Sequence, residues 1–313
     1  MDMFNYTLKR ILQMIPVFII VAVLVFVLIR LIPGDPAKVM LGERATETSL
    51  AAMRAKLGLD KSYVTQFLIY AKQLIHFDLG DSIKYNMPVS KLLGQKLMVT
   101  LSLTLVSTLF TIILSFAPGY IAGIFKDKLP DTIIRVIALV ALSVPTFWIG
   151  LMLLTIFAVH WKFFPVSGWG TGILEHIRGL ILPGITQAIC VSAIMVRNLR
   201  NNVVDIRHSD YVDFARSKGI SPLRVSTAHI IRNALIPTTT LLALRIASML
   251  GGSIVVESVF TLPGLGALLV NAIYARDYPV VQGVVLLFVV LVMVINLATD
   301  IIYSLIDPRV KLS

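Results

Sequence analysis

The chain has 313 residues, of which 57% are hydrophobic and only 14% are charged. Soluble domains carry about 25% charged residues, because their surfaces must be polar. This composition excludes an ordinary soluble protein and predicts an integral membrane protein. The formal net charge of +11 fits cationic loops beside anionic lipid headgroups, and no basic block interleaved with aromatic residues indicates nucleic-acid binding. Cys190 is the one cysteine, so an intrachain disulfide is excluded.

Six apolar segments predict membrane-spanning helices, because a bilayer core about 30 Å thick needs roughly 20 apolar residues in helical form. The fifth segment is interrupted by Arg245 and contains Glu257 near its far end, but apolar runs flank Arg245 and six helices give a consistent topology. We therefore expect an all-α, polytopic fold with about six transmembrane helices. The expected spans are residues 11–31, 97–125, 136–159, 179–196, 233–260 and 279–303.

The distribution of Lys and Arg predicts which loops face the cytoplasm. The cation-rich segments, expected in the cytoplasm together with both termini, are residues 1–10, 126–135, 197–232 and the tail 304–313. The segments expected outside are 32–96, 160–178 and 261–278. Residues 32–96 contain many cations, but a loop longer than about 60 residues crosses the membrane largely regardless of charge. The first apolar run ends in Arg30 and a Pro-Gly-Asp-Pro turn rather than a cleavage site, so we expect it to be retained.

The large external segment contains two stretches with apolar residues at helical spacing, residues 48–60 and 62–80. They predict amphipathic helices at the membrane surface. Asp60 is expected to cap the second helix, since Asp accepts hydrogen bonds from the free amides of a first turn. Two interpretations stay open: a docking face for a substrate-delivery protein, or a lid that packs over the bundle.

No motif indicates chemistry within this chain. A phosphate-binding loop is absent from the sequence, so we expect ATP hydrolysis to require other subunits. The five histidines are scattered without the spacing of metal ligands, and no catalytic constellation indicates a membrane enzyme. We expect no cofactor, no metal and no enzymatic activity in this chain.

Polar and small residues of the fifth segment are candidates for a translocation pathway. A charged residue in a helix centre costs roughly 2.5–3.5 kcal/mol, so Arg245 is expected to face water or to pair with a carboxylate such as Asp300. The glycines and Ser253 could line a pathway or permit close packing, and Glu257 could be interfacial. The candidate pathway residues are Arg245, Gly251, Gly252, Ser253 and Glu257.

Two further features concern helix packing. Gly119 and Gly123 form a GxxxG pattern in the second segment, which is typical of close helix contact. Pro145 interrupts the third segment and predicts a kink, because proline removes a helical hydrogen bond.

The segment from Arg197 to Arg232 has seven Lys or Arg among 36 residues. At its centre, Asp213-Phe214-Ala215-Arg216-Ser217-Lys218-Gly219 resembles the loop signature of ATP-binding-cassette (ABC) importer permeases, in which E-A-A and three residues precede a glycine. Asp213 replaces the usual Glu, and Phe214 replaces the first Ala. The closing Ile236-Pro237 lies further downstream than in sugar importers and is similar to that of the peptide and nickel branch.

Other segments are similar to that branch in the same order along the chain. They are Leu31-Ile32-Pro33-Gly34-Asp35-Pro36, Leu57-Gly58-Leu59-Asp60, Asp78-Leu79-Gly80-Asp81-Ser82, Gly251-Gly252-Ser253-Ile254-Val255-Val256-Glu257, Pro263-Gly264-Leu265-Gly266 and Arg276-Asp277-Tyr278-Pro279-Val280. The chain thus resembles the first permease subunit of dipeptide, oligopeptide and nickel importers, almost from end to end.

The resemblance implies a multi-pass permease of the prokaryotic inner or plasma membrane, with the type I importer fold. Its implied partners are a second permease, two ABC ATPases that use ATP and Mg²⁺, and an extracytoplasmic solute-binding protein or lipoprotein. The residues implied in ATPase coupling are Asp213, Phe214, Ala215, Arg216, Lys218 and Gly219, with Gly219 turning the chain in a left-handed conformation.

The cargo and the functional class both stay open at this point. The implied cargo is a peptide, but a nickel chelate, glutathione or another small solute is an alternative. The main rival class is an ion-driven secondary transporter or channel, although the sequence shows no clear duplicated halves. A membrane enzyme is the third class, for which we find no candidate residues.

Overall fold

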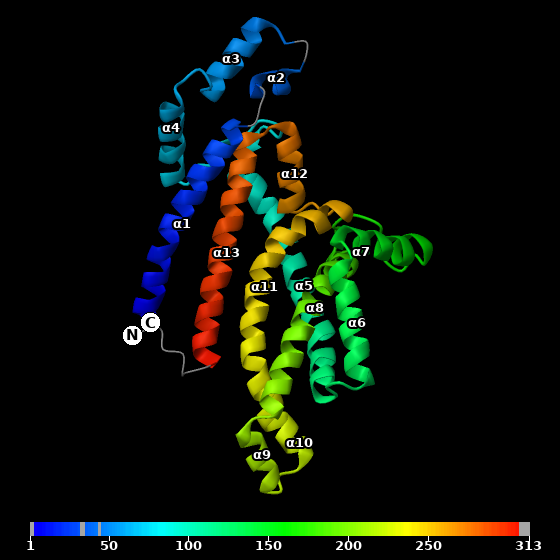
Figure 1. Ribbon diagram of the computed structural model, residues 1–313. Coiled ribbons are helices and arrows are strands. Elements are labelled where there is room, and N and C mark those ends of the chain that lie inside the picture. Colours follow the sequence, from blue (N-terminus) through cyan, green and yellow to red (C-terminus); the bar gives the residue numbers. More distant parts are fainter. Residues whose placement is uncertain (1–2, 32–34, 43–44, 307–313) are drawn as a thin grey trace.

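The computed structural model describes residues 3–31, 35–42 and 45–306 (Figure 1). Residues 1–2 and 307–313 of the two predicted cytoplasmic termini lie outside the described residues, as do 32–34, which include the first two residues of the Pro-Gly-Asp-Pro motif, and 43–44 of the predicted external segment. Five helices are long and apolar enough to span a membrane within the described part of the chain, and a bent pair could supply a sixth span. These five helical stretches contain α1 (Met3–Leu31), α5 (Val89–Ile124), α8 (Ile173–Arg207), α11 (Arg232–Val259) and α13 (Tyr278–Ile306). The predicted all-α fold is confirmed, apart from two strands of two residues each.

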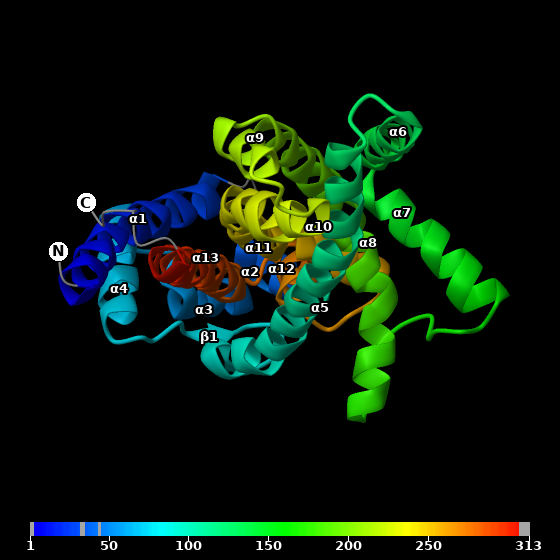
Figure 2. The same cartoon turned by 90° about the horizontal axis from the view of Figure 1, so that it is seen from below.

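The bent pair replaces the single span predicted over residues 136–159. It consists of α6 (Leu129–Ser143) and α7 (Thr146–Leu153), and α7 continues as a wide π-helical stretch, η1 (Leu154–His160). The two parts meet at an angle of 102°, so the kink predicted at Pro145 is present as a sharp elbow. Val144 is extended, as expected for a residue before proline. Helix α7 contacts α8 and α11, and the chain then runs outward from the bundle (Figure 2).

Helices α5 and α8 form the most extensive helix pair of the fold. Their backbones approach closely at the two glycines of the GxxxG pattern. A Cβ atom on Gly119 would lie 3.0 Å from Leu199 Cβ, and one on Gly123 would lie 2.5 Å from Val203 Cγ1. The prediction of close packing at these glycines is therefore confirmed. Helix α1 lies at the edge of the bundle, beside α13.

The external helices lie at one end of the bundle (Figure 1). They are α2 (Pro36–Leu41), α3 (Glu47–Leu57) and α4 (Tyr63–Ile75), followed by a hairpin of β1 (Asp81–Ser82) and β2 (Met87–Pro88), and α12 (Leu265–Ala275) lies at the same end. Helices are present in both predicted stretches, as α3 and α4, and their position at a membrane surface stays a prediction. The predicted cap of α4 is wrong, because Ser62 rather than Asp60 immediately precedes the helix, and its hydroxyl accepts the Thr65 N–H.

The opposite end of the bundle is extended by α9 (Asp210–Ser217), α10 (Pro222–Arg224) and a second π-helical stretch, η2 (Val225–Ile231), which leads into α11 (Figure 1). The turn between α5 and α6 is also directed toward this end. Segments 126–135 and 197–232, predicted in the cytoplasm, thus lie at the opposite end of the molecule from segments 32–96 and 261–278, predicted outside, as far as these segments are described (Figure 1). This is the arrangement that the predicted topology requires, and the sidedness itself stays a prediction.

Candidate functional site

Helix α9 projects beyond the bundle and contains most of the predicted coupling residues (Figure 1). Asp210 and Asp213 lie in its first turn and Arg216 lies in its last turn, so the side-chain charges complement the helix dipole. Gly219 follows the helix with φ +75°, a left-handed conformation that glycine adopts without steric cost. The prediction that Gly219 turns the chain at this point is confirmed.

One face of α9 holds the helix against the bundle. Val212 and Ala215 are buried in an apolar cluster with Leu199 of α8, Val225 of η2 and Ala234 of α11. Ala215 is only 5% exposed, so it packs within this chain rather than at the outer face. The helix is therefore anchored by α8 and α11 together.

The other face of α9 is open to solvent. Phe214 is 61% exposed, and Lys218 Nζ lies 4.5 Å from the centre of its ring. Asp213 and Arg216 form an exposed ion pair at 3.0 Å. An exposed aromatic side chain ringed by charged groups is typical of protein–protein contact surfaces. Of the predicted coupling residues, Asp213, Phe214, Arg216, Lys218 and Gly219 lie on the exposed face or at the end of α9.

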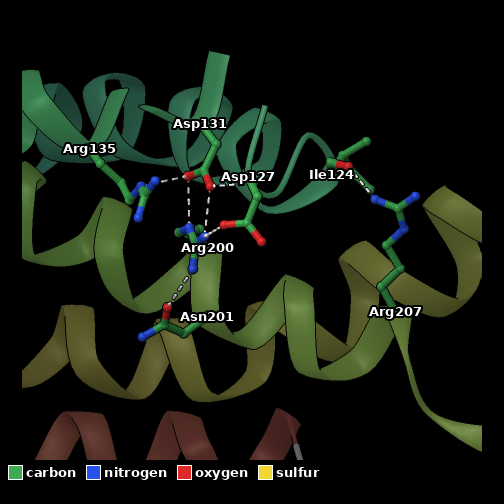
Figure 3. Close-up of polar contacts among 7 residues, drawn as sticks. All are labelled: Ile124, Asp127, Asp131, Arg135, Arg200, Asn201 and Arg207. Atoms are coloured by element: carbon green, nitrogen blue, oxygen red, sulfur yellow. Dashed lines mark hydrogen bonds and ion pairs between the residues drawn. The ribbon is translucent and has the colours of Figure 1, made fainter. Parts of the chain in front are cut away.

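A buried ion pair joins the first turn of α6 to α8, close to the start of the projection (Figure 3). Arg200 of α8 donates to both oxygens of Asp131, through Nε at 2.8 Å and Nη2 at 2.7 Å. Asp131 is 0% exposed and Arg200 is 14% exposed. Asp131 also accepts the Asp127 N–H at 2.9 Å, and Arg135 Nε lies 3.4 Å away.

A second contact joins the same elements beside this pair. The guanidinium of Arg207, the last residue of α8, donates to the Ile124 carbonyl at the end of α5 (Figure 3). Together these contacts link α5, α6 and α8 immediately before α9. We name the Asp131–Arg200 ion pair and the Arg207–Ile124 bond the inner clamp. The sequence analysis missed it, since the paired residues are 69 and 83 positions apart and only the charged turn at residues 126–131 signals it locally.

The predicted pathway residues divide between two environments. Gly251 and Gly252 are exposed, and Gly251 has open space where a Cβ would lie. Ser253 and Glu257 are 0% exposed and point into the chain. The structure therefore does not bring the five candidates together along one surface.

Arg245 lies part-way along α11 and is half-buried. Its Nε atom is buried and has no hydrogen-bond partner among the residues that the structure describes. The pairing with Asp300, left open by the sequence, is not observed, because Asp300 forms an ion pair with Arg10 at 3.2 Å.

Glu257 joins three helices at the outer end of the bundle. Its Oε1 accepts the Thr100 hydroxyl of α5 at 2.7 Å, and its Oε2 accepts the Ala267 N–H of α12 at 3.0 Å. The Thr100 hydroxyl oxygen in turn accepts the Leu265 N–H at 2.9 Å. A carboxylate at a helix N-terminus satisfies free amides and complements the helix dipole. Glu257 thus attaches α12 to α5 and α11, and we name this arrangement the outer joint.

The outer joint also explains the Pro-Gly-Leu-Gly segment. A Cβ on Gly264 would lie 2.4 Å from both carboxylate oxygens of Glu257, and a Cβ on Gly266 would lie 2.6 Å from Ile254 Cα. Any side chain at either position would displace Glu257 or α11.

Within the described part of the chain, no three His, Cys, Asp or Glu side chains gather as metal ligands would.

Comparison with known protein families identifies the family to which this chain belongs. The family described as "Binding-protein-dependent transport system inner membrane component" matches residues 115–312, and the model of its N-terminal region matches residues 3–104. The chain belongs to this family. It is an ABC importer permease and a multi-pass protein of the inner membrane, which confirms the resemblance seen in the sequence motifs.

Curated relatives match the permease over nearly its whole length. The glutathione transport system permease protein GsiC of Salmonella typhi is 39% identical over 309 residues, with 99% of both chains covered. A putative peptide transport system permease protein of Brucella abortus (strain 2308) is 40% identical over 307 residues, with 97% of this chain and 98% of the relative covered.

Solved structures show the same fold at low sequence identity. An inward-facing MetNI methionine ABC transporter matches with a TM-score of 0.59 and 19% identity, over 69% of this permease and 96% of that chain. An amino acid ABC transporter with histidines matches with a TM-score of 0.54 and 17% identity, over 71% of this permease and 95% of that chain. Nearly a third of the permease has no counterpart in these two structures.

Proposed function

We propose that this permease forms, with a second permease subunit, the pathway for di- and oligopeptides that an extracytoplasmic binding protein delivers. Two ABC ATPase subunits supply the energy, and they rather than this chain bind ATP and Mg²⁺. Support for the energy source comes from the family, whose members belong to binding-protein-dependent transport systems. Support for the cargo comes from relatives named as peptide and glutathione permeases.

The observation that carries the proposal is the exposed face of α9 at the projecting end of the bundle. Phe214 offers a large apolar side chain to a cleft on an ATPase, and Asp213, Arg216 and Lys218 surround it with charges that can pair with the partner. Gly219 ends the helix and lets the chain return toward α10 and η2. This face therefore serves as the docking surface for the ATPase.

The inner clamp gives that docking a mechanical consequence. When the ATPases close on ATP, they displace α9, which is anchored to α8 by the apolar cluster of Val212 and Ala215. The clamp makes α8 move together with α5 and α6, because Asp131 and Arg200 form two short hydrogen bonds away from water. Such rigid-body rocking of a helix bundle is a standard route to alternating access. The exposed glycines of α11, Gly251 and Gly252, are the part of the pathway wall that this chain offers.

Transport in proteoliposomes tests the function. The permease, purified with the subunits with which it assembles, is reconstituted with ATP inside or outside, and uptake of labelled trialanine is measured with the cognate binding protein present. We expect uptake only when ATP is on the ATPase side and the binding protein is on the opposite side. Uptake without ATP or ATPase subunits would instead indicate an ion-driven transporter.

Glutathione is the second candidate cargo, because relatives such as GsiC are named for its transport. It is a small peptide with free carboxylates, so the same pathway could pass it. Competition in the same assay separates the two candidates: excess glutathione suppresses trialanine uptake only if the system accepts glutathione. A nickel chelate or another small solute is tested in the same way.

A further inference from the structure

The outer end of the permease contains a cavity of about 990 Å³. Its walls are the end of α1, helices α3 and α4, the β1–β2 hairpin and the start of α13. Pockets that bind small molecules have volumes of roughly 300–1,000 Å³. The cavity lies between the N-terminal region, where α3 and α4 extend from the bundle (Figure 1), and the helix core. Its size and position allow it to hold a solute that arrives from outside.

One wall of the cavity presents a cation without a counterion. Arg30 donates through Nε to Gln66 Oε1 at 2.9 Å and through Nη1 to the Phe26 carbonyl at 3.1 Å. No ion pair to Arg30 is formed within the described residues, where the nearby Asp35 pairs with Arg54 at 2.6 Å. A partly desolvated charge without a countercharge is unfavourable. An anionic group bound in the cavity would supply the missing negative charge beside Arg30.

A second donor lies beside Arg30. The Tyr70 hydroxyl is buried and has no hydrogen-bond partner in the part of the chain that the structure describes. Burial raises the pKa of Tyr70 to about 12, so the hydroxyl stays protonated and can donate. Both side chains pack on Phe26, with the guanidinium carbon 3.3 Å and the Tyr70 ring centre 5.5 Å from the centre of the Phe26 ring. A guanidinium that lacks a counterion and a hydroxyl that lacks an acceptor thus lie close together beside the cavity.

Other parts of the wall have the opposite charge. Asp78 and Asp81 line the cavity near the β1–β2 hairpin, and side-chain amides such as those of Gln73 and Gln282 lie between the charged groups. A ligand that suits this lining has a carboxylate, an ammonium group and amide bonds. An anionic lipid headgroup suits it less well, because it would face these two carboxylates.

We propose that this cavity is an outer holding site for a short peptide, in which Arg30 and Tyr70 bind the peptide carboxylate and Asp78 and Asp81 face its ammonium group. The inference rests on the proposed function, since it takes the transported solute to be a peptide. It adds a binding site on the permease itself, separate from the glycine-lined face of α11.

A pair of probes that differ only in the carboxylate tests this site. Binding of labelled trialanine and of trialanine amide is measured by equilibrium dialysis, using the reconstituted complex in nanodiscs without the binding protein. We expect trialanine to bind about tenfold or more tightly than its amide, since a charge-assisted hydrogen bond contributes on this scale. Arg30→Gln and Tyr70→Phe should each weaken trialanine binding and reduce the preference over the amide. Arg178→Gln, which alters an exposed external arginine bonded to the Phe163 carbonyl, is the matched control and should bind like the wild type.

Two outcomes would overturn the inference. One is equal binding of the two probes, or unchanged binding in both Arg30→Gln and Tyr70→Phe. The other is displacement of trialanine by phosphatidylglycerol in the nanodiscs, which would assign the donors to a lipid phosphate. ATP-dependent uptake by the wild type is measured separately to test the proposed transport function. If that uptake is observed together with either of these outcomes, the holding site is wrong and the proposed transport function stands.

Discussion

Asp131 and Glu257 are both fully buried carboxylates, and each is bound by groups from a distant part of the chain. Asp131 is neutralised by Arg200, whereas Glu257 is bound by a hydroxyl and by amides at a helix N-terminus. Because an unpaired buried charge costs several kcal/mol, these partners decide whether each residue stabilises or destabilises the fold. Burial and these partners thus assign both residues to the framework that holds the helices together.

The Asp131→Asn variant tests whether the Asp131–Arg200 ion pair stabilises the fold. The amide keeps the shape of the side chain but leaves Arg200 with only the exposed Asp127 carboxylate, 3.9 Å away, as a counterion, so the free energy of unfolding should fall by about 3 kcal/mol, the lower end of the range for a broken buried pair. Unfolding in detergent can be followed through the reactivity of Cys190, which is the one cysteine and is half-buried.

The control for this variant is Asp213→Asn, which makes the same change in the exposed Asp213–Arg216 pair. An exposed pair contributes about 0–1 kcal/mol, so this variant should unfold almost like the wild type. Equal losses in the two variants would show that the Asp131–Arg200 pair does not stabilise the fold.

At the scale of elements, the sequence predicted a helix well where its apolar run covers most of the helix. The apolar runs at 11–31, 97–125 and 279–303 correspond to α1, α5 and α13. The run at 179–196 marked only the apolar part of α8, which extends to Arg207, because hydropathy reports the membrane and not the end of a helix. Long-range partners such as Arg200 and Asp131 leave no periodic signal, so the inner clamp could not be predicted.

The elbow between α6 and α7 was predicted only as a kink. Proline breaks a helix locally, but the direction of the helix after the break depends on the residues against which that helix packs. Here Gly150 of α7 approaches the core, where an added Cβ would lie 3.2 Å from Thr186 Cγ2 and 3.3 Å from the ring of Phe260. The role of Glu257 in the outer joint could not be predicted either, since it depends on α12 folding back against α11.

Two glycines of the same helix provide the test at this scale. Gly123→Ala places a methyl group 2.5 Å from Val203 Cγ1 and should lower the free energy of unfolding by about 1–3 kcal/mol through overpacking. Gly94→Ala has no atom within 4 Å of the new methyl group and should be neutral or stabilising by up to about 1 kcal/mol, because alanine favours helix. Adding Val203→Ala to Gly123→Ala should recover part of the loss. Identical effects of the two glycine substitutions would argue against close α5–α8 packing.

At the scale of the whole molecule, the inner clamp and the outer joint both include α5. The clamp connects it to α6 and α8, and the joint connects it to α11 and α12. Helix α5 therefore belongs to both connections, so in the proposed mechanism it is the helix through which a displacement of α9 reaches the outer end. This continuity lets a movement at one end of the bundle change the other end without deforming individual helices.

Gly219→Leu tests whether α9 transmits that movement. The substitution forces a branched residue into a left-handed conformation and adds bulk at the proposed ATPase-docking surface. We expect ATP-dependent uptake to fall at least tenfold and the binding protein to stop stimulating ATPase activity, while membrane insertion is unchanged. Asp213→Lys should have the same direction of effect by reversing a charge on that surface.

The matched control is Gly42→Leu at the external end of α2. Gly42 has φ +78° and ψ 177°, a conformation essentially restricted to glycine, and open space around its Cβ position, so the backbone strain of a leucine there is at least as large as at Gly219. Uptake by this variant should stay close to that of the wild type. Comparable losses in both variants would attribute the effect of Gly219→Leu to backbone strain alone.

The elbow at Pro145 has a consequence for the surrounding bilayer. The 15 residues of α6 rise only about 22 Å at 1.5 Å each, some 8 Å less than a hydrocarbon core of about 30 Å. Beyond the elbow, Phe147, Trp148 and Leu151 of α7 are exposed. Hydrophobic mismatch of this kind is relieved when the lipid thins or a neighbouring subunit covers the gap. The acyl-chain length of the host membrane thereby becomes a variable of transport, acting on the α6–α7 side of the permease.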